Sequence, residues 1–120
     1  MDGILVINKP LGYTSRDIVN IVSKVLGTKK VGHTGTLDPM ATGVLVLCMG
    51  KSLKLVEMLM EHDKVYIAKI KLGIETDTLD ITGNVLKEEM VRDITKEEVE
   101  KVLNKFIGKI SQKVPKYKFI

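Results

Sequence analysis

The chain has 120 residues, a formal net charge of +4 and a single cysteine, Cys48. This length fits one domain, and one cysteine excludes an intrachain disulfide. No apolar run approaches the ~20 residues of a membrane-spanning helix, so we expect a cytoplasmic protein without a membrane partner. The mild surplus of positive charge favours RNA as a partner about as strongly as it favours an ordinary lysine-rich surface.

The first part of the chain has the pattern of a strand followed by an amphipathic helix. Residues 3–8 are an apolar run rich in Ile, Leu and Val, which predicts a buried strand. Thr14 or Ser15 is placed to cap a helix, because apolar residues recur at helical spacing over 18–26. Gly27 is the expected C-cap of this helix.

The middle of the chain predicts two more strands around a helical segment. Residues 44–49 form a second apolar run, and the apolar positions of 53–60 have a helical spacing. Over 64–72 apolar residues alternate with lysines, which predicts a strand with one solvated face. Residues 76–83 are polar and rich in turn formers, and 84–86 are expected to start a further strand.

The last part predicts one helix and a basic tail. Thr95 and Glu98 have the spacing of a capping box before an apolar helical pattern, and Gly108 is the expected C-cap. Residues 101–120 contain six lysines and no acid, and Pro115 excludes a central strand there. Strands and helices are mixed without a regular βαβ alternation, so the predicted fold class is α+β.

The loop before the strand at 44–49 is the strongest candidate for a functional segment. Residues 30–43 contain three glycines, three threonines, a histidine, a proline and one carboxylate, Asp38. Glycine permits turns that other residues disfavour, and Pro39 pushes Asp38 toward an extended conformation. A carboxylate on such a loop can act as a nucleophile or as a general acid or base. An aspartate before a proline also commonly forms a structural turn.

Other kinds of site find little support in the pattern. The two histidines and one cysteine, at 33, 62 and 48, lack the spacing of a zinc site, and the glycine-rich loop lacks nucleotide-binding motifs. We therefore expect no metal and no cofactor. On its own, His33 fits a proton shuttle, a ligand, a stacking group or a locally hydrogen-bonded loop residue. Tyr66 fits ordinary packing on a strand.

Five blocks of sequence, in order, resemble the TruB family of tRNA pseudouridine synthases. They are Gly-Ile-Leu-Val-Ile-Asn-Lys-Pro at 3–10, Gly-Tyr-Thr-Ser at 12–15, Gly-His-Thr-Gly-Thr-Leu-Asp-Pro-Met-Ala-Thr-Gly at 32–43, Asp-Lys-Val-Tyr at 63–66, and Leu-Gly-Ile-Glu-Thr-Asp-Thr-Leu-Asp at 72–80 with Gly83. The resemblance extends from about residue 3 to about residue 117. It implies the pseudouridine synthase catalytic-domain fold, a mixed and largely antiparallel sheet flanked by helices.

The resemblance also implies a reaction and a set of site residues. Asp38 falls on the catalytic aspartate of the superfamily, acting as nucleophile or base on uridine 55 of the tRNA T-arm, with no cofactor. His33 is implied to contact RNA at the flipped-out nucleotide, and Tyr66 to stack on the target base. Lysine contacts to phosphate position RNA without reading its sequence. The remaining residues expected to contact substrate or RNA are Gly35, Thr36, Lys9, Lys30 and Asp80.

Two departures from the family pattern shape the expectation for this chain. Lys118-Phe119-Ile120 follows the Pro-x-Tyr at 115–117, where the family continues with Ser-Ala, a hydrophobic residue and Lys. The family's second half is missing, including an arginine motif that pairs with the catalytic aspartate; Arg16 and Arg92 are the only arginines.

We therefore expect residues 1–120 to be the N-terminal part of a single catalytic domain. The fold is expected to be incomplete at its C-terminal end, without a C-terminal RNA-binding domain, and unpaired sheet edges favour self-association. The predicted function is that of an isomerase, a tRNA pseudouridine synthase. The alternatives are a truncated, non-catalytic RNA-binding fragment that needs its missing half for activity, and a purely structural domain that binds no RNA.

Overall fold

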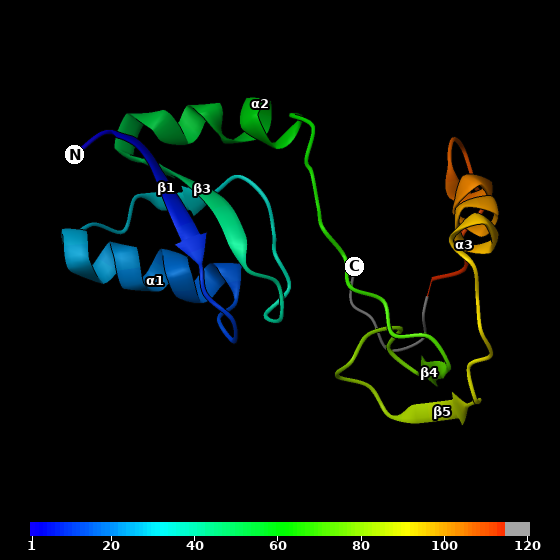
Figure 1. Cartoon of the computed structure of the whole chain (residues 1–120). Coiled ribbons are helices and arrows are strands. Elements are labelled where there is room, and N and C mark those ends of the chain that lie inside the picture. Colours follow the sequence, from blue (N-terminus) through cyan, green and yellow to red (C-terminus); the bar gives the residue numbers. More distant parts are fainter. Residues whose placement is uncertain (115–120) are drawn as a thin grey trace. The chain divides into compact units, whose positions relative to one another are not determined.

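The computed structural model describes residues 1–114 (Figure 1). The chain divides into two compact units, Met1–Tyr66 and Ile67–Ile120. The predicted mixture of strands and helices is confirmed, and every paired strand in the described residues is antiparallel.

The first unit is built on a three-stranded sheet. Its strands are β1 (Gly3–Lys9), β2 (Val31–His33) and β3 (Gly43–Met49), in the spatial order β1-β3-β2. The two apolar runs predicted to be strands are thus β1 and β3, which pair along their whole length. The short strand β2 was not predicted, because three residues within a glycine-rich segment carry no recognisable alternation.

The helix predicted at the start of the chain is α1 (Ser15–Leu26). Thr14 is its N-cap, with a complete capping box to Asp17, and Gly27 is its C-cap in the left-handed conformation at φ 64°. Hydrogen bonds from Thr14 hold the pKa of the Asp17 carboxyl below its ordinary value, and the nearby Lys9 charge lowers it further. Both predicted ends of the helix are confirmed.

The core lies between α1 and one face of the sheet. Side chains at alternate positions of β3 point to this face, as the two-residue period of a strand requires. The buried residues of this cluster are Ile18, Val19, Val22, Val31, Leu45, Leu47 and Met49, with Leu5, Ile7, Leu26 and Leu37 packed against it. One loop residue, Leu37, thus contributes to the core next to the candidate aspartate.

A second helical segment covers part of the opposite face, so that α1 and this segment lie on opposite sides of the sheet (Figure 1). It consists of the 3₁₀ turn η1 (Gly50–Leu55) and α2 (Val56–Met60). A Cβ placed on Gly32 would lie 2.9 Å from Leu53 Cδ2, which shows how closely this segment approaches β2. Cys48 on the same face is fully buried, and burial raises the pKa of its thiol.

Gly50 joins β3 to this segment at a position where only glycine fits. Its φ is +61°, and a Cβ there would lie 2.5 Å from the Met1 carbonyl oxygen and also against the Asp2 carboxylate. Gly27 has a similar φ of +64° but open space around it. Substitutions at the two glycines can therefore be compared. Such a comparison distinguishes the free-energy cost of the left-handed backbone conformation from the cost of a steric clash.

We expect Gly27→Ala to lower the free energy of unfolding by about 1 kcal/mol, the cost of a left-handed conformation for a residue with a Cβ. Gly50→Ala should cost at least about 1 kcal/mol more, because the added methyl overlaps backbone as well. Urea denaturation followed by circular dichroism measures both values. An equal loss of unfolding free energy in the two variants would contradict this expectation. It would show that Met1 and Asp2 can move away from the added methyl group without loss of stability.

The second unit contains a hairpin and a helix. The hairpin strands are β4 (Ile74–Thr76) and β5 (Val85–Glu88), and the helix is α3 (Lys96–Leu103), followed by the 3₁₀ turn η2 (Asn104–Phe106). The capping box between Thr95 and Glu98 is confirmed. The Arg92 guanidinium donates to Glu98 at 2.8 Å and, with the Thr95 backbone, lowers the pKa of that carboxyl. No residue of 67–114 is buried.

The prediction of a strand over 64–72 is wrong for this structure. No strand is assigned between α2 and β4, and the side chains of Val65 and Ile67 are 94% and 96% exposed. The alternating pattern identifies a segment able to form a half-buried strand, but a strand needs a paired neighbour, and no strand of residues 1–114 pairs with it. Gly108 is also not the cap of α3, which ends at Leu103 with Asn104 as its C-cap.

The structure of residues 1–114 also bears on the expectations about membrane spans and self-association. Within residues 1–114 no helix is long and apolar enough to cross a membrane. Both outer strands of the first sheet, β1 and β2, have one unpaired edge, so self-association through these edges stays a prediction. The Pro-x-Tyr motif at 115–117 and the residues after it lie outside the described part of the chain.

Candidate active site

The loop that carries Asp38 connects β2 to β3 within the first unit. It begins immediately after His33 and ends at Gly43. Its first residue, Thr34, is buried, and both its backbone nitrogen and its hydroxyl donate to the Val46 carbonyl oxygen, at 3.0 and 3.1 Å. The loop is therefore anchored to the central strand at its start.

The backbone on both sides of Asp38 is held by the segment that precedes α1. Before Asp38, Leu37 exchanges two hydrogen bonds with the Ser15 hydroxyl, which accepts from the Leu37 nitrogen at 2.8 Å and donates to its carbonyl oxygen at 3.3 Å. After Asp38, the Pro39 carbonyl oxygen accepts from the Gly12 nitrogen at 2.7 Å. The loop is therefore fixed at its centre as well as at its start.

Lys9 reinforces this arrangement from inside the protein. Its side chain is 0% exposed, and Nζ donates to the carbonyl oxygens of Pro10, Tyr13 and Pro39 at 3.0, 2.6 and 3.4 Å. We expected Lys9 to contact RNA phosphate, with an ordinary surface lysine as the alternative. The structure supports neither, because its ammonium is directed at backbone carbonyls, and Lys9 instead ties the 10–13 turn to the Asp38 loop.

The Asp38 side chain itself is left available. Asp38 is exposed, and none of the hydrogen bonds or ion pairs found over residues 1–114 involves its carboxylate; only its backbone carbonyl is used, accepting from the Ala41 nitrogen at 2.9 Å. A carboxylate that caps or closes a turn would be accepting hydrogen bonds from nearby backbone. The geometry thus disfavours the purely structural alternative for Asp38 and fits a group that meets a ligand.

Three other predicted residues lie on or beside the same loop. His33 ends β2 and is partly buried, and its Nδ1 is buried without a hydrogen-bond partner in the described part of the chain. Gly35 is approached by Lys64, whose Cε would lie 3.3 Å from a Cβ at that position. Thr36 is exposed, two residues before Asp38.

Lys30 and Tyr66 belong to the same unit but are not joined to the loop by a hydrogen bond within residues 1–114. Lys30 has an exposed side chain, and its carbonyl oxygen accepts from the Gly50 nitrogen at 2.9 Å. Tyr66 is 63% exposed, so it is not the packed strand residue of the simpler interpretation. It follows Lys64 by two residues, and Lys64 is the side chain that approaches Gly35 in the loop.

Asp80 lies in the second unit, in the loop between β4 and β5. Its carboxylate accepts from the Thr78 hydroxyl at 2.7 Å and from the Thr82 nitrogen at 2.9 Å. In the same loop, Asp77 accepts from the Asn84 backbone nitrogen at 2.8 Å. The two aspartates therefore organise their own loop, and contact of Asp80 with substrate or RNA stays a prediction.

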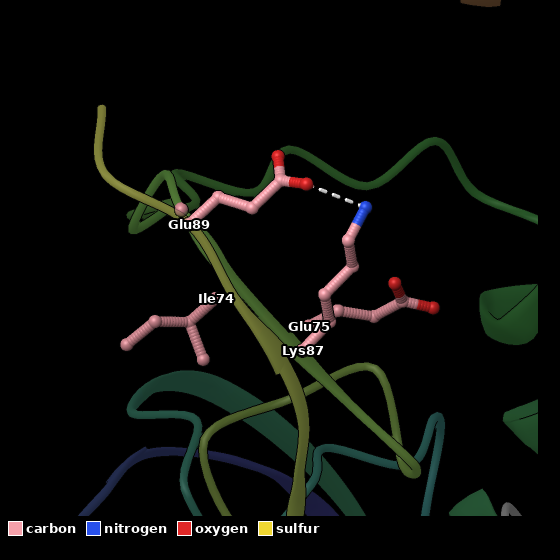
Figure 2. A pocket seen from close by; sticks show the side chains of 5 residues that line it. Ile74, Glu75, Lys87 and Glu89 are labelled. Atoms are coloured by element: carbon pink, nitrogen blue, oxygen red, sulfur yellow. Dashed lines mark ion pairs between the residues drawn. The ribbon is translucent and has the colours of Figure 1, made fainter. Parts of the chain in front are cut away.

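A surface pocket of about 190 Å³ lies on the hairpin of the second unit and involves none of the predicted residues. It is lined by Gly73, Ile74, Glu75, Lys87 and Glu89, and Figure 2 shows the ion pair of Lys87 with Glu89, at 2.6 Å, on one side of it. Pockets that bury small ligands usually exceed about 300 Å³. No cluster of His, Cys, Asp and Glu suited to a metal ion occurs within residues 1–114.

Two residues that hold the site were not predicted. Ser15 and Gly12 carry no local signal of contact with a loop more than 20 positions away, and Ser15 was read only as a possible helix cap. One signal was available, because two adjacent hydroxyl residues cannot both cap one helix. The second hydroxyl then needs another partner if it is buried.

Comparison with known proteins assigns the chain to a family through a segment that includes this loop. Residues 23–118 match the family described as TruB family pseudouridylate synthase, N-terminal domain. This match covers most of the chain and includes Asp38, so the chain belongs to the TruB family of pseudouridylate synthases.

Relatives named tRNA pseudouridine synthase B match along the whole chain or nearly so. The protein of Fusobacterium nucleatum is 51% identical over 120 residues, and that of Clostridium tetani is 52% identical over 120 residues. The Bacillus subtilis protein is 50% identical over 118 residues. These alignments cover 42%, 42% and 38% of the respective relatives, so the chain spans about two fifths of their length.

Proposed function

We propose that this chain supplies the catalytic aspartate of a tRNA pseudouridine synthase that converts uridine 55 of the T-arm to pseudouridine. The observation that carries the proposal is the exposed Asp38 carboxylate on a loop whose backbone is held on both sides. Family membership and the names of relatives about 50% identical support the reaction class and a tRNA substrate.

The proposed reaction is an isomerisation in which no atom is gained or lost overall. The bond between the ribose C1′ and N1 of uracil breaks, the base turns, and a bond forms between C1′ and C5. The hydrogen on C5 leaves, and N1 ends with a proton. Asp38 assists either by attacking the sugar covalently or by removing a sugar proton, and its rigid backbone suits both, since each needs the carboxylate at a defined distance from the ribose.

The other predicted residues are proposed to bind the substrate around Asp38. A uridine inside a folded RNA has to leave its stack before chemistry, and a stacking group then holds the extruded base. Tyr66, largely exposed, is proposed for that role, and His33 for contact with RNA at the vacated position. Gly35 and Thr36 are proposed to let the backbone approach the RNA, and Lys30 to meet phosphate.

The proposed architecture is the N-terminal part of one pseudouridine synthase catalytic domain. In that fold Asp80, which organises the β4–β5 loop, is proposed to lie near the substrate. The expected location is the cytoplasm, where tRNA is processed.

A second function, RNA binding without catalysis by these residues alone, is favoured by one observation. No cationic group pairs with Asp38 within residues 1–114; of the two arginines, Arg92 is paired with Glu98. Asp38 is exposed here, but a carboxylate that bound RNA encloses in a closed site needs such a partner. The two functions are separated by product, because a binding module retains tRNA but forms no pseudouridine.

The test uses this chain and a chimera in which residues 1–120 replace the matching segment of the Clostridium tetani relative. Each is incubated with an unmodified tRNA transcript, and pseudouridine is mapped by position. We expect the chimera to form one pseudouridine per transcript, at position 55. It should form none in a transcript that carries cytidine at that position. Product at other positions would contradict the substrate assignment, and a folded chimera without product beside an active parent relative would contradict the function.

A further inference from the structure

Two adjacent hydroxyl residues begin α1, and they have different partners. Thr14 is the N-cap, and its Oγ1 accepts from the Asp17 nitrogen at 3.0 Å. Ser15 follows it, is only 2% exposed and does not cap the helix. Burying a hydroxyl is costly unless it is hydrogen-bonded, so the partner of Ser15 shows what this residue does.

Both partners of the Ser15 hydroxyl belong to Leu37, the residue directly before Asp38. The Leu37 nitrogen donates to Ser15 Oγ at 2.8 Å, and Ser15 Oγ donates to the Leu37 carbonyl oxygen at 3.3 Å. A hydroxyl has one proton to donate and lone pairs to accept, so one side chain serves both backbone groups. These two bonds connect positions 22 residues apart in the sequence.

The Leu37 carbonyl lies in the same planar peptide unit as the backbone nitrogen of Asp38. A hydrogen bond to that carbonyl therefore restricts the orientation of the peptide plane that joins Leu37 to Asp38. Pro39, on the other side, is held through its carbonyl by the Gly12 nitrogen at 2.7 Å. Of the residues that fix this backbone, Ser15 is the one that acts through a neutral side chain and can be changed without altering charge.

We propose that Ser15 is a positioning residue for Asp38: its hydroxyl fixes the Leu37 backbone and thereby the place of the carboxylate. This inference rests on the proposed function of Asp38. Ser15 does not touch the reacting atoms. A displacement of about 1 Å can cost about 100-fold in rate when a reaction depends on alignment, so the loss of this hydroxyl should affect the chemical step more than binding.

The competing explanation is that Ser15 only stabilises the start of α1. Thr14→Ala is the matched control, because it removes a hydroxyl from the neighbouring position, weakens the same helix end and leaves the Leu37 bonds intact. Ser15→Thr keeps a hydroxyl and serves as the conservative variant. A role confined to helix stability would make the two alanine variants behave alike.

The first measurement is amide hydrogen exchange in this chain. In Ser15→Ala the Leu37 amide should exchange at least about 10-fold faster, because its acceptor is gone, while the Leu47 amide in β3 keeps its protection. In Thr14→Ala the Leu37 amide should be unchanged, and Ser15→Thr should restore its protection. If Ser15→Ala unfolds, Ser15→Cys takes its place, because it keeps a group of similar size with a far weaker hydrogen bond.

The second measurement is single-turnover pseudouridine formation, in whichever form of the protein is active in the test of function above. Ser15→Ala should lower the rate about 10- to 100-fold with less than about a 3-fold change in tRNA affinity, and Thr14→Ala should leave both unchanged. Unchanged Leu37 exchange in a folded Ser15→Ala or Ser15→Cys variant would overturn the inference, and so would faster exchange with an unchanged rate. Absence of product from the chimera without any substitution, beside an active relative, would refute the proposed function instead. Exchange of the Leu37 amide would still decide whether Ser15 orders the loop.

Discussion

Replacing Asp38 by asparagine should abolish pseudouridine formation while leaving the fold and tRNA binding intact. The expected loss in the single-turnover rate is at least about 100-fold, because removal of a general base typically costs 10²–10⁴-fold and removal of a nucleophile costs more. Stability should change by less than about 0.5 kcal/mol, since the side chain is exposed and has no hydrogen-bond partner in the described part of the chain. Quench-flow or manual time courses with excess chimera measure the rate.

Asp93→Asn is the control for Asp38→Asn, because it makes the same chemical change at an exposed aspartate of the second unit. It should retain the parent rate. A rate for Asp38→Asn within about 10-fold of the parent would exclude a catalytic role for this carboxylate. A loss of tRNA binding equal to the loss of rate would assign Asp38 to binding rather than to chemistry.

Replacing Lys9 should cause a large loss of stability in the first unit. Lys9→Met keeps most of the apolar stem but removes the ammonium, so the carbonyl oxygens of Pro10, Tyr13 and Pro39 lose a buried donor. Hydrogen bonds to a charged group contribute about 1.5–3 kcal/mol, so we expect the free energy of unfolding to fall by about 2–4 kcal/mol. Urea denaturation followed by circular dichroism checks this value.

Lys29→Met is the matched control, since it makes the same change at an exposed lysine. It should alter the free energy of unfolding by less than about 0.5 kcal/mol. If Lys9→Met proved as stable as the parent and lost tRNA affinity instead, the phosphate-binding role first expected for Lys9 would be restored. The described hydrogen bonds predict the opposite result.

Sequence alone predicted the parts of the fold that depend on local physics. The strands at 3–8 and 44–49 are continuous apolar runs, and both capped helix starts, at Thr14 and Thr95, follow from hydroxyl and carboxylate spacing. The segment 64–72 has an equally clear alternation but no strand, because pairing depends on a partner that a local pattern does not contain. A local sequence pattern thus shows that a segment is able to form a strand, but it does not show whether that strand finds a partner.

In the candidate site, too, one part was predictable from the sequence and another part was not. Asp38 stood out because glycine, threonine and proline surround it, and in the structure hydrogen bonds hold its loop and its carboxylate is exposed. Its support was not predictable, because Ser15, Gly12 and Lys9 are distant in sequence and ordinary in type. Lys9 in particular looks like a surface lysine until its burial under the loop is known.

The most direct test of the central claim, that Asp38 drives uridine isomerisation, is release of tritium from C5 of uridine in tRNA. That hydrogen has to leave when C5 bonds to the sugar, so its release reports the chemistry itself and not binding. We predict one equivalent of tritium per tRNA from the chimera carrying residues 1–120 and none from its Asp38→Ala variant. Equal release from both would contradict the assignment of Asp38, and release from neither, beside an active parent relative, would contradict the proposed function of this chain.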